Sequence, residues 1–349
     1  MKIFVYEYLT GGGLLADASM SAGIDSLARE GRAMCAALAA DFDAVGGIEV
    51  MCLRDARQAG PHAPNVCWVG VRSAAEHDVA FDRAAADADW SVVIAPEIGG
   101  VLLERCRRVM AVGGRLLGSS PRLVELAGDK HATAVYLADA GVPVPRGMPF
   151  VPGEPWPRDF PCPAVWKPLD GAGSQGLRFI EHSEVPCVDA SRRHGRLEAF
   201  CHGIAASVAL LCGPNGQVGL PPCRQRLSQE GRFHYLGGAL PLPPPLSDRA
   251  TRLARRAIQS LPEPLGYLGV DLVLGESDDG SRDVVIEINP RLTTSYIGLR
   301  AACRQNLAAA MLAIASGEPY NLSFCNEMIE FSSDGRVGPA SLRAPAHQR

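Results

Sequence analysis

Three oxygen-bearing side chains interrupt two apolar segments in the C-terminal part of the chain. Asp271 lies in GVDLVLGE, and Glu287 and Asn289 lie in VVIEINP. The turn sequence ESDDGS separates the two segments, so a hairpin would place Asp271 beside Glu287. Residues two apart share one face of a strand, which groups Glu287 with Asn289. Buried unpaired carboxylates are costly, and all-oxygen donors suit Mg²⁺ that bridges nucleotide phosphates. The alternative is a satisfied buried aspartate and a strand-terminal glutamate.

A second candidate site is the glycine-rich segment KPLDGAGSQG at 167–176, between two predicted strands. Glycine lets backbone N–H groups turn toward an anion without interference from a Cβ atom. The residues that would form this cradle are Gly171, Gly173, Ser174 and Gly176. The segment is not a Walker A motif, because its lysine precedes the glycines and no helix signal follows. A β-hairpin with a loose glycine turn is an equal alternative.

Lysine is rare in this chain, which makes each lysine informative. Of 34 basic residues only Lys2, Lys130 and Lys167 are lysine, so arginine supplies ordinary positive charge. A retained lysine is then expected where a compact ammonium is required. Lys167 stands directly before the glycine segment and can place a point charge on a phosphate. Arg291 directly follows the acidic hairpin and could neutralise transferring phosphate oxygens.

The elements that must position these residues begin with an α/β region. Strand and helix patterns alternate here, which predicts an open parallel sheet covered by helices. The expected strands are 2–9, 48–55 and 90–97, and the expected helices are 21–42 and 101–112. The glycines at 11–13 follow the first strand but lack the GxGxxG spacing, so a plain loop is favoured over a dinucleotide site.

The remainder of the chain predicts a mixture of helices and β-strands. Two helical stretches fill 121–142, and a proline-rich connector follows at 142–163. The expected strands are 164–168, 177–180, 204–212, 233–240, 269–276 and 283–290. The segment 241–248 is expected to be a rigid linker before a helix at 249–260. A helix at 299–316 is expected to close the fold, and the polar tail 332–349 is expected to be loosely ordered.

Composition excludes several classes of protein. The 349 residues carry a net charge of −4, which gives no basic surface for nucleic acid or anionic membrane. Glu7 interrupts the apolar run that a signal peptide needs, and no apolar segment reaches the ~18 residues of a membrane helix. The eleven cysteines show no CxxC or zinc spacing. We therefore expect a cytoplasmic protein with reduced thiols.

Together these residues resemble the ATP-grasp superfamily over about 121–300, preceded by the α/β domain that usually accompanies it. The resemblance implies that Lys130, in AGDKHATAVYLADAGVPVP, and Lys167 contact ATP phosphates. It implies that Asp271, Glu287 and Asn289 bind Mg²⁺ or Mn²⁺ and that Arg291 lies beside the phosphates, where Arg291 and Lys167 would be catalytic. The implied fold has an N-terminal Rossmann-like open parallel sheet and two α+β lobes that clamp ATP. The expected division is 1–120, 121–197, 198–331 and a tail at 332–349.

The segment LEAFCHG at 197–203 resembles the hinge of this superfamily. The resemblance implies that Glu198, Phe200 and Cys201 surround the adenine. Many relatives carry an acid shortly after the hinge that holds the ribose hydroxyls. Here the sequence is GIAAS, without an acid, so we expect the ribose contact to come from elsewhere or to be weak.

Three further segments resemble the tyramine–glutamate ligases of methanofuran biosynthesis within the superfamily. They are MKIFVYEYLTGGG, FHYLGGALPL and EINPRLTTSYIGL. The resemblance implies an ATP-dependent ligase that activates a carboxylate, such as glutamate, as an acyl phosphate and joins it to a tyramine- or tyrosine-type amine. The high arginine and alanine content suggests a high-GC bacterial source. For such a source the resemblance would imply the methylofuran pathway, with tyrosine in place of tyramine.

Several alternatives remain open at this point. Another ATP-grasp amino-acid or dipeptide ligase and a non-catalytic nucleotide-binding protein would carry the same motifs. Arg224 and Arg226 would extend over the triphosphate or be surface residues. Thr293, Thr294 and Ser295 would bind a substrate carboxylate or cap a loop. Small-molecule carboxylate and amine substrates are the expected partners, and a homodimer is possible.

Overall fold

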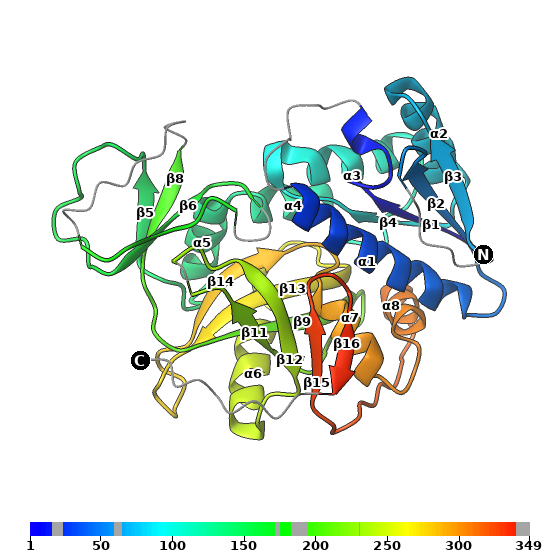
Figure 1. Cartoon of the computed structure of the whole chain (residues 1–349). Helices are drawn as coiled ribbons and strands as arrows, with labels where there is room; N and C mark the ends of the chain where they lie inside the picture. The colour runs from blue at the N-terminus through cyan, green and yellow to red at the C-terminus, as the bar shows by residue number, and fades with distance from the viewer. Residues whose placement is uncertain (16–23, 59–64, 172–174, 183–193, 230, 340–349) are drawn as a thin grey trace.

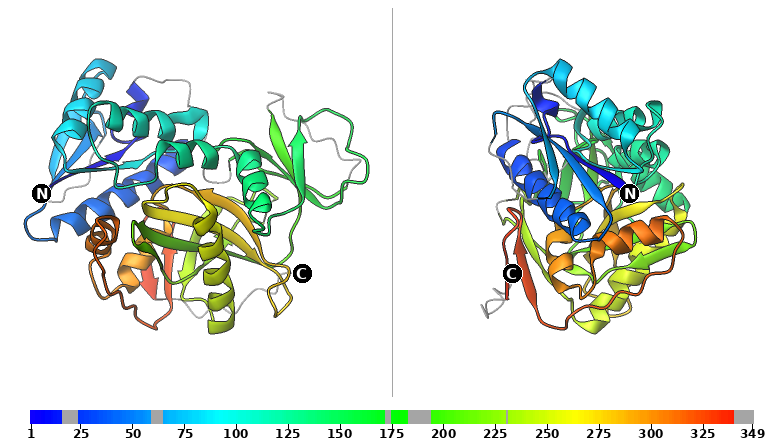
Figure 2. Two further views of the ribbon diagram at one scale, coloured as in Figure 1. Left: turned by 180° about the vertical axis from the view of Figure 1, so that it is seen from behind. Right: turned by 90° about the vertical axis from the view of Figure 1, so that its right-hand side faces the viewer.

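The computed structural model describes residues 1–15, 24–58, 65–171, 175–182, 194–229 and 231–339. Its described strands form three sheets. The N-terminal sheet and the largest sheet lie against each other, and the smallest sheet projects to one side (Figures 1 and 2). The predicted α/β class with a parallel N-terminal sheet is confirmed.

The N-terminal sheet is entirely parallel and has the order β3-β2-β1-β4. Its strands are β1 (Lys2–Glu7), β2 (Glu49–Asp55), β3 (Cys67–Val71) and β4 (Trp90–Ile94). Its helices are α1 (Ile24–Asp43), α2 (Ala74–Asp87) and α3 (Val101–Ala111). All of β4 is buried, as expected for an apolar strand covered on both faces. The sequence analysis missed β3, because this short edge strand is partly exposed and shows neither strand pattern clearly.

Helix α1 joins the N-terminal sheet to the C-terminal part of the chain. Its Met34, Leu38 and Phe42 share one core with residues of α7 (Ser295–Ala302) and α8 (Leu307–Ala315). Two polar contacts support this packing: Tyr296 Oη and Arg300 Nε both donate to Asp41 Oδ2, at 2.6 and 2.9 Å. Helix α1 is thus held between the N-terminal sheet and helices α7 and α8 (Figure 1).

The smallest sheet is antiparallel and has the order β5-β8-β6-β7. Its strands are β5 (Gly147–Phe150), β6 (Ala164–Pro168), β7 (Arg178–Ile180) and β8 (Gly195–Ala199). The expected division at 197/198 therefore falls inside β8. Helices α4 (Pro121–Ala127) and α5 (Lys130–Asp139) precede this sheet. Asp129 caps α5 by accepting from His131 N and Ala132 N, which fixes Lys130 at the first turn.

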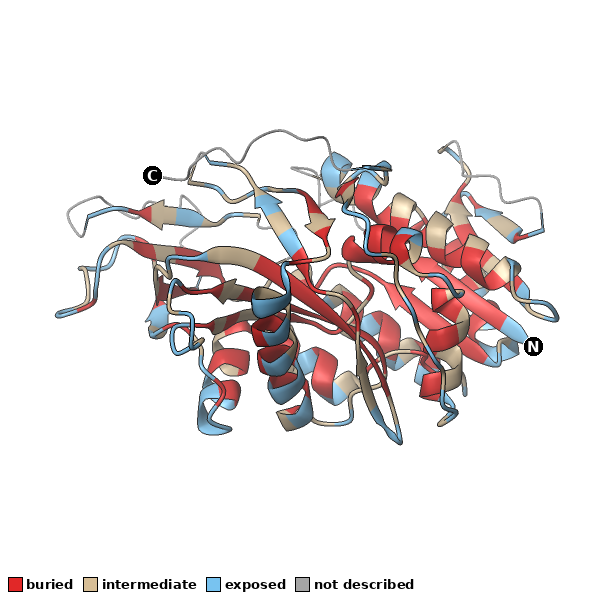
Figure 3. Ribbon diagram, turned by 90° about the horizontal axis from the view of Figure 1, so that it is seen from below, coloured by how far each residue is buried: buried red, intermediate tan, exposed pale blue. Residues whose placement is uncertain are grey.

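The largest sheet has eight strands in the order β14-β13-β9-β11-β12-β15-β16, with β10 beside β9. They are β9 (Ile204–Gly213), β10 (Gly216–Gly219), β11 (Cys223–Leu227), β12 (Tyr235–Leu240), β13 (Gly266–Leu274), β14 (Val284–Asn289), β15 (Ile329–Ser332) and β16 (Val337–Pro339). Strands β13 and β14 form the predicted hairpin, with Asp271 directly opposite Glu287. The central strands are buried, whereas the outer surface of α6 (Pro244–Ser260) is exposed (Figure 3).

Two helix predictions need correction. The segment expected as one helix at 299–316 forms α7 and α8, because Asn306 accepts from Ala309 N and starts a new helix. The expected linker 241–248 is partly helical, because α6 starts at Pro244. Proline is tolerated in the first turn, since N–H groups there have no partner within the helix.

Part of the expected tail pairs in the sheet as β16, and residues 340–349 lie outside the described residues. Among the described helices, none has the length and apolar character to cross a bilayer.

Candidate active site

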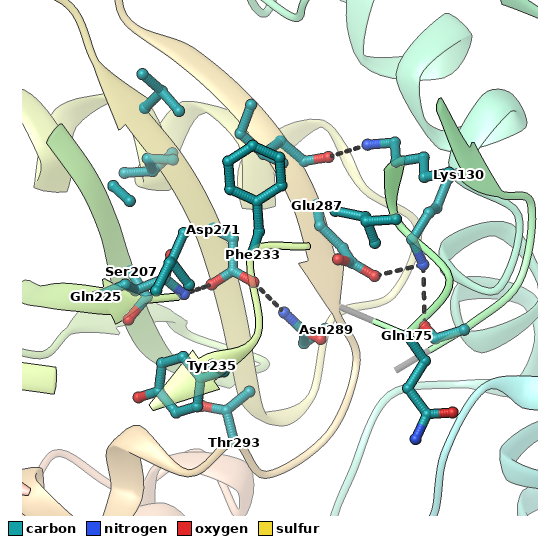
Figure 4. Close-up of a pocket in the computed structure, with 18 of the residues that line it drawn as sticks. Lys130, Gln175, Ser207, Gln225, Phe233, Tyr235, Asp271, Glu287, Asn289 and Thr293 are labelled. Atoms are coloured by element: carbon teal, nitrogen blue, oxygen red, sulfur yellow. Dashed lines mark hydrogen bonds and ion pairs between the residues drawn. The ribbon is translucent and has the colours of Figure 1, made fainter. Parts of the chain in front are cut away.

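A cavity of about 1090 Å³ lies where the three sheets meet. Residues from all three parts of the chain line it, including the two predicted lysines, the acidic hairpin and Arg291. The predicted site residues are thus brought together, although they lie far apart in the sequence. Figure 4 shows Lys130 on one side of Glu287 and Asp271, Asn289 and Gln225 on the other.

Lys130 holds the acidic hairpin to the glycine segment. Its Nζ lies 2.7 Å from Glu287 Oε1 and donates to Gly171 O at 3.0 Å. Burial alone would lower the pKa of Lys130, but the carboxylate of Glu287 outweighs it and raises this pKa. Burial would likewise raise the pKa of Glu287, yet Lys130 and Lys167 hold it below its usual value. Both groups are therefore charged at neutral pH.

Lys167 is held by a second buried acid. Its Nζ lies 2.8 Å from Glu198 Oε2 and donates to Ile286 O at 3.2 Å. Arg196 Nε donates to the other oxygen, Glu198 Oε1, at 2.6 Å. Both carboxylate oxygens of Glu198 thus have cationic partners, so this side chain positions Lys167. The predicted contact of Glu198 with adenine remains a prediction.

Asp271 forms no ion pair with a lysine or arginine among the described residues. Its oxygens accept from Gln225 Nε2 at 2.8 Å and from Asn289 Nδ2 at 3.2 Å. Burial and the neighbouring charge of Glu287 raise the pKa of Asp271 from 3.8 to about 7. A divalent cation between Asp271 and Glu287 would remove that repulsion. The donor set of two carboxylates and an amide oxygen therefore fits Mg²⁺ or Mn²⁺.

The sequence analysis missed Gln225 and proposed its two neighbours instead. Gln225 and Arg224 both line the cavity, and Gln225 contacts Asp271. Arg226 donates instead to Phe331 O at 3.2 Å and lies 3.5 Å from Glu330. Arg226 is therefore the neighbour of Gln225 that points away from the cavity, whereas Arg224 lines it as proposed.

Arg291 is fixed by an acid from the N-terminal part of the chain. Its Nε and second terminal nitrogen each donate to Glu97, both at 2.9 Å, and the pair is largely buried. Burial would lower the pKa of Arg291, but Glu97 raises it. Two residues further on, Gly99 N donates to Asp170 Oδ2 at 2.8 Å. The segment after β4 therefore touches both the glycine segment and Arg291. Neither Glu97 nor this link was expected from the sequence.

Aromatic rings surround the expected adenine end. Phe200 lies 5.1 Å from Phe179 and 6.1 Å from Phe233, and its ring is tilted by only 23° from that of Phe233. Cys201 and Gly171 also line the cavity, and Glu276 lines it from the β13–β14 turn. The sequence analysis missed Phe179, Phe233 and Glu276. Gly176 is exposed beside the cavity-lining Gln175 and Leu177, whereas Gly173 and Ser174 lie outside the described residues.

The cavity also extends away from the lysines, toward α1. Tyr235 and Thr293 lie together at that end (Figure 4). The hydroxyls of Tyr267, Thr293 and Ser295 lie within 2.8–3.0 Å of one another. Of the predicted polar group, Thr293, Thr294 and Ser295 all line the cavity. This end carries no lysine among the described residues.

Comparisons with known proteins agree with this geometry. Residues 127–295 match the family described as the ATP-grasp domain, and residues 48–124 match the pre ATP-grasp 3 domain. The chain is 27% identical over 246 residues to a tyramine–L-glutamate ligase of Methanocaldococcus jannaschii, covering 70% of this chain and 68% of that protein. The enzyme of the same name from Methanocaldococcus fervens is 27% identical over 244 residues, covering 70% and 71%.

A solved structure supports the fold independently. The N5-carboxyaminoimidazole ribonucleotide synthetase of Thermotoga maritima superposes with a TM-score of 0.67 at 18% sequence identity. The superposition covers 94% of this chain and 79% of that one. At this identity the likeness concerns the fold alone.

Proposed function

The chain belongs to the ATP-grasp superfamily and is an ATP-dependent C–N ligase, and we propose that it joins glutamate to an amine of the tyramine or tyrosine type. The proposal takes its substrates from relatives named tyramine–L-glutamate ligase. The observation that carries the activity is the convergence of Lys130, Lys167, Asp271 and Glu287 on one cavity.

We propose that the triphosphate of ATP lies between the lysines and the acidic hairpin. Lys130, Lys167 and Arg291 are three cations that can stabilise negative charge on the phosphates during transfer. A carboxylate oxygen of the substrate attacks the γ-phosphorus, the bond to ADP breaks, and an acyl phosphate forms. The amine nitrogen then attacks the acyl carbon and displaces phosphate. This sequence of steps needs no covalent enzyme intermediate.

Asp271, Glu287 and Asn289 are the residues that would hold a divalent cation. Mg²⁺ or Mn²⁺ at this position supplies positive charge that binds nucleotide phosphates. A cation held by Glu287 would compete with Lys130 for this carboxylate, and the Lys130 ammonium would then be available to the nucleotide phosphates. The buried pair between Lys130 and Glu287 therefore keeps both side chains in place before ATP arrives.

The proposed product is a glutamyl amide with an aromatic amine. We place this reaction in the synthesis of a methanofuran- or methylofuran-type cofactor. Support comes from the segments MKIFVYEYLTGGG, FHYLGGALPL and EINPRLTTSYIGL, whose residues lie on β1, β12, β14 and α7 around the cavity.

ADP release with paired substrates tests the proposal. The purified protein with ATP and Mg²⁺ is given glutamate together with tyramine, tyrosine or other amines, and the products are identified by mass. We expect ADP only when both substrates are present, and a mass equal to their amide. ADP release with other amino-acid pairs but with no glutamate–amine pair would contradict the proposed substrates and support a dipeptide-type ligase. No ADP with any pair would contradict ligase activity itself.

A further inference from the structure

One face of α1 forms a wall of the cavity. Leu27, Glu30, Gly31 and Met34 all line it, and their spacing of three or four residues places them on one side of the helix. This face of α1 is thus apolar except for the carboxylate of Glu30. A second buried carboxylate, Glu7 of β1, lies against Gly31, and it already accepts hydrogen bonds from Leu9 N, Thr10 N and Thr10 Oγ1. Opposite this face of α1 stand Tyr235 of β12 and the segment 293–295. The result is a chamber that the nucleotide-binding residues do not occupy.

Glu30 is a buried acid with weak compensation. Its side chain accepts from Thr294 Oγ1 at 3.2 Å and from Ser26 Oγ at 3.5 Å, and the residue is 9% exposed. Within the described part of the chain, no lysine or arginine forms an ion pair with it. Burial raises the pKa of Glu30 to about 7, against the smaller opposing effects of Thr294 and Arg291. A carboxylate in such a place is stabilised by a ligand that carries a donor and a positive charge.

Glu30 contacts the loop that carries Arg291. Its partner Thr294 follows Arg291 by three residues on the loop that leaves β14. Asn289, at the end of β14, belongs to the proposed cation site. A group held by Glu30 therefore lies next to the loop that carries the phosphate-side arginine, on the side of the cavity away from Lys130 and Lys167.

We propose that this face of α1 is the subsite for the acceptor amine, and that Glu30 binds the amine nitrogen and receives a proton from it. The inference deepens the proposed function and rests on it. Leu27 and Met34 would contact the apolar body of the amine. The subsite therefore selects a primary ammonium on a carbon skeleton without a second charge near α1.

The proton balance gives Glu30 a defined task. A bound alkylammonium has three N–H protons and no lone pair, so it cannot attack. One proton passes to Glu30, and the free amine attacks the acyl carbon. The C–N bond forms, the C–O bond to phosphate breaks, and the second proton leaves with the departing phosphate. One N–H remains in the amide, and Glu30 returns its proton to solvent.

The same observations disfavour a carboxylate ligand at this position. A carboxylate beside Glu30 would face like charge in a buried setting, which costs free energy. A glutamate bound by its own ammonium at Glu30 would have to place a second carboxylate near Leu27 and Met34, which offer it no donor. The alternative that Glu30 holds the glutamate remains an outcome of the test.

Glu30→Gln is the decisive variant, with two acceptors measured side by side. Hydroxylamine is small and uncharged at about pH 8. It intercepts an acyl phosphate without a base to deprotonate it. We expect Glu30→Gln to raise the KM for the aromatic amine by roughly tenfold or more and to lower kcat with it. The KM values for ATP and glutamate, and the rate of glutamyl hydroxamate formation, should stay within about twofold of the wild-type values.

Matched variants separate the outcomes. Asp25→Asn removes an exposed acid from the same helix and should change neither acceptor reaction. Glu30→Asp keeps the charge and should recover part of the amine reaction. An unchanged KM for the amine in Glu30→Gln would overturn the inference, as would equal loss of the hydroxamate reaction or a shift in the KM for glutamate. Failure of the proposed function is distinct, because wild-type protein would then form no hydroxamate from glutamate.

Discussion

Buried acids have different partners at the two ends of the cavity. At the nucleotide end, Glu287 lies 2.7 Å from Lys130, and Glu198 lies between Lys167 and Arg196. At the α1 end, Glu30 has hydroxyl partners and no ion pair among the described residues. The acids at the nucleotide end are therefore neutralised before ligands bind. At the α1 end, none of the described residues neutralises Glu30, so its cationic partner is expected to be a ligand.

Asp271 lies between these two ends and shares features of both. It faces Glu287 across the hairpin but receives only amide donors from Gln225 and Asn289. Its raised pKa follows from burial beside a like charge. We therefore assign an incoming cation to each of the two acids that lack an ion pair: a metal ion to Asp271 and an ammonium to Glu30.

Glu287→Gln should produce the largest effect. The change removes a proposed metal ligand and the partner of Lys130 together, so we expect ligase turnover to fall by about 10³-fold. ADP release at saturating substrates measures this loss. Glu125→Gln, an exposed acid on α4, is the control. Turnover within tenfold of wild type would contradict the proposed position of the metal.

The sequence predicted the nucleotide end better than the α1 end, for a physical reason. Lys130, Lys167, Asp271 and Glu287 stand out because they are rare or polar residues within apolar segments, and local hairpin geometry brings the two acids together. Glu97 and Glu30 lie in the N-terminal part of the chain and reach the site only through packing between distant elements. Local periodicity carries no information on that packing.

Element prediction failed for related reasons. The stretch at 299–316 is largely apolar, but α7 ends at Ala302 and the Asn306 side chain caps the start of a second helix, α8. Strand β3 and strand β11 were missed because edge exposure and alternating arginines hide their pattern. The parallel sheet and the β13–β14 hairpin were predicted because continuous apolar runs and a clear turn sequence specify them locally.

Glu198→Gln tests the compensated end through stability. The change leaves Lys167 and Arg196 buried without a full counter-charge, so the free energy of unfolding should fall by roughly 3 kcal/mol. Chemical denaturation at neutral pH measures it. Asp170→Asn changes an acid whose partner is a backbone N–H near the surface, and should cost less. A stability equal to wild type would show that the two cations do not depend on Glu198.

Glu97→Gln tests whether the N-terminal domain positions Arg291. The guanidinium loses its bidentate partner but stays in the cavity, so we expect kcat to fall by about tenfold while the KM for the amine changes little. Steady-state ADP release with each substrate varied in turn measures both constants. Glu104→Gln, an exposed acid on the nearby helix α3, is the matched control. If only the KM for ATP changed, Arg291 would contribute to binding ATP rather than to stabilising the transition state.

Asp271→Asn should raise the free energy of unfolding, whereas Glu198→Gln should lower it. This increase should be the smallest of the predicted effects. The pKa of Asp271 is raised to about 7, so the folded protein binds this proton more tightly than the unfolded chain does. Stability from this group is full at low pH and is lost as pH rises through about 7, since the carboxylate must then ionise beside Glu287. The substituted amide stays neutral at every pH, so the nucleotide-free variant should be more stable than wild type by about 1–2 kcal/mol near pH 8. The difference should shrink toward about pH 4, where the aspartate of the folded wild-type protein is itself uncharged. Thermal unfolding of both proteins across this range measures it, and a variant less stable at every pH would show that Asp271 is already compensated within the fold.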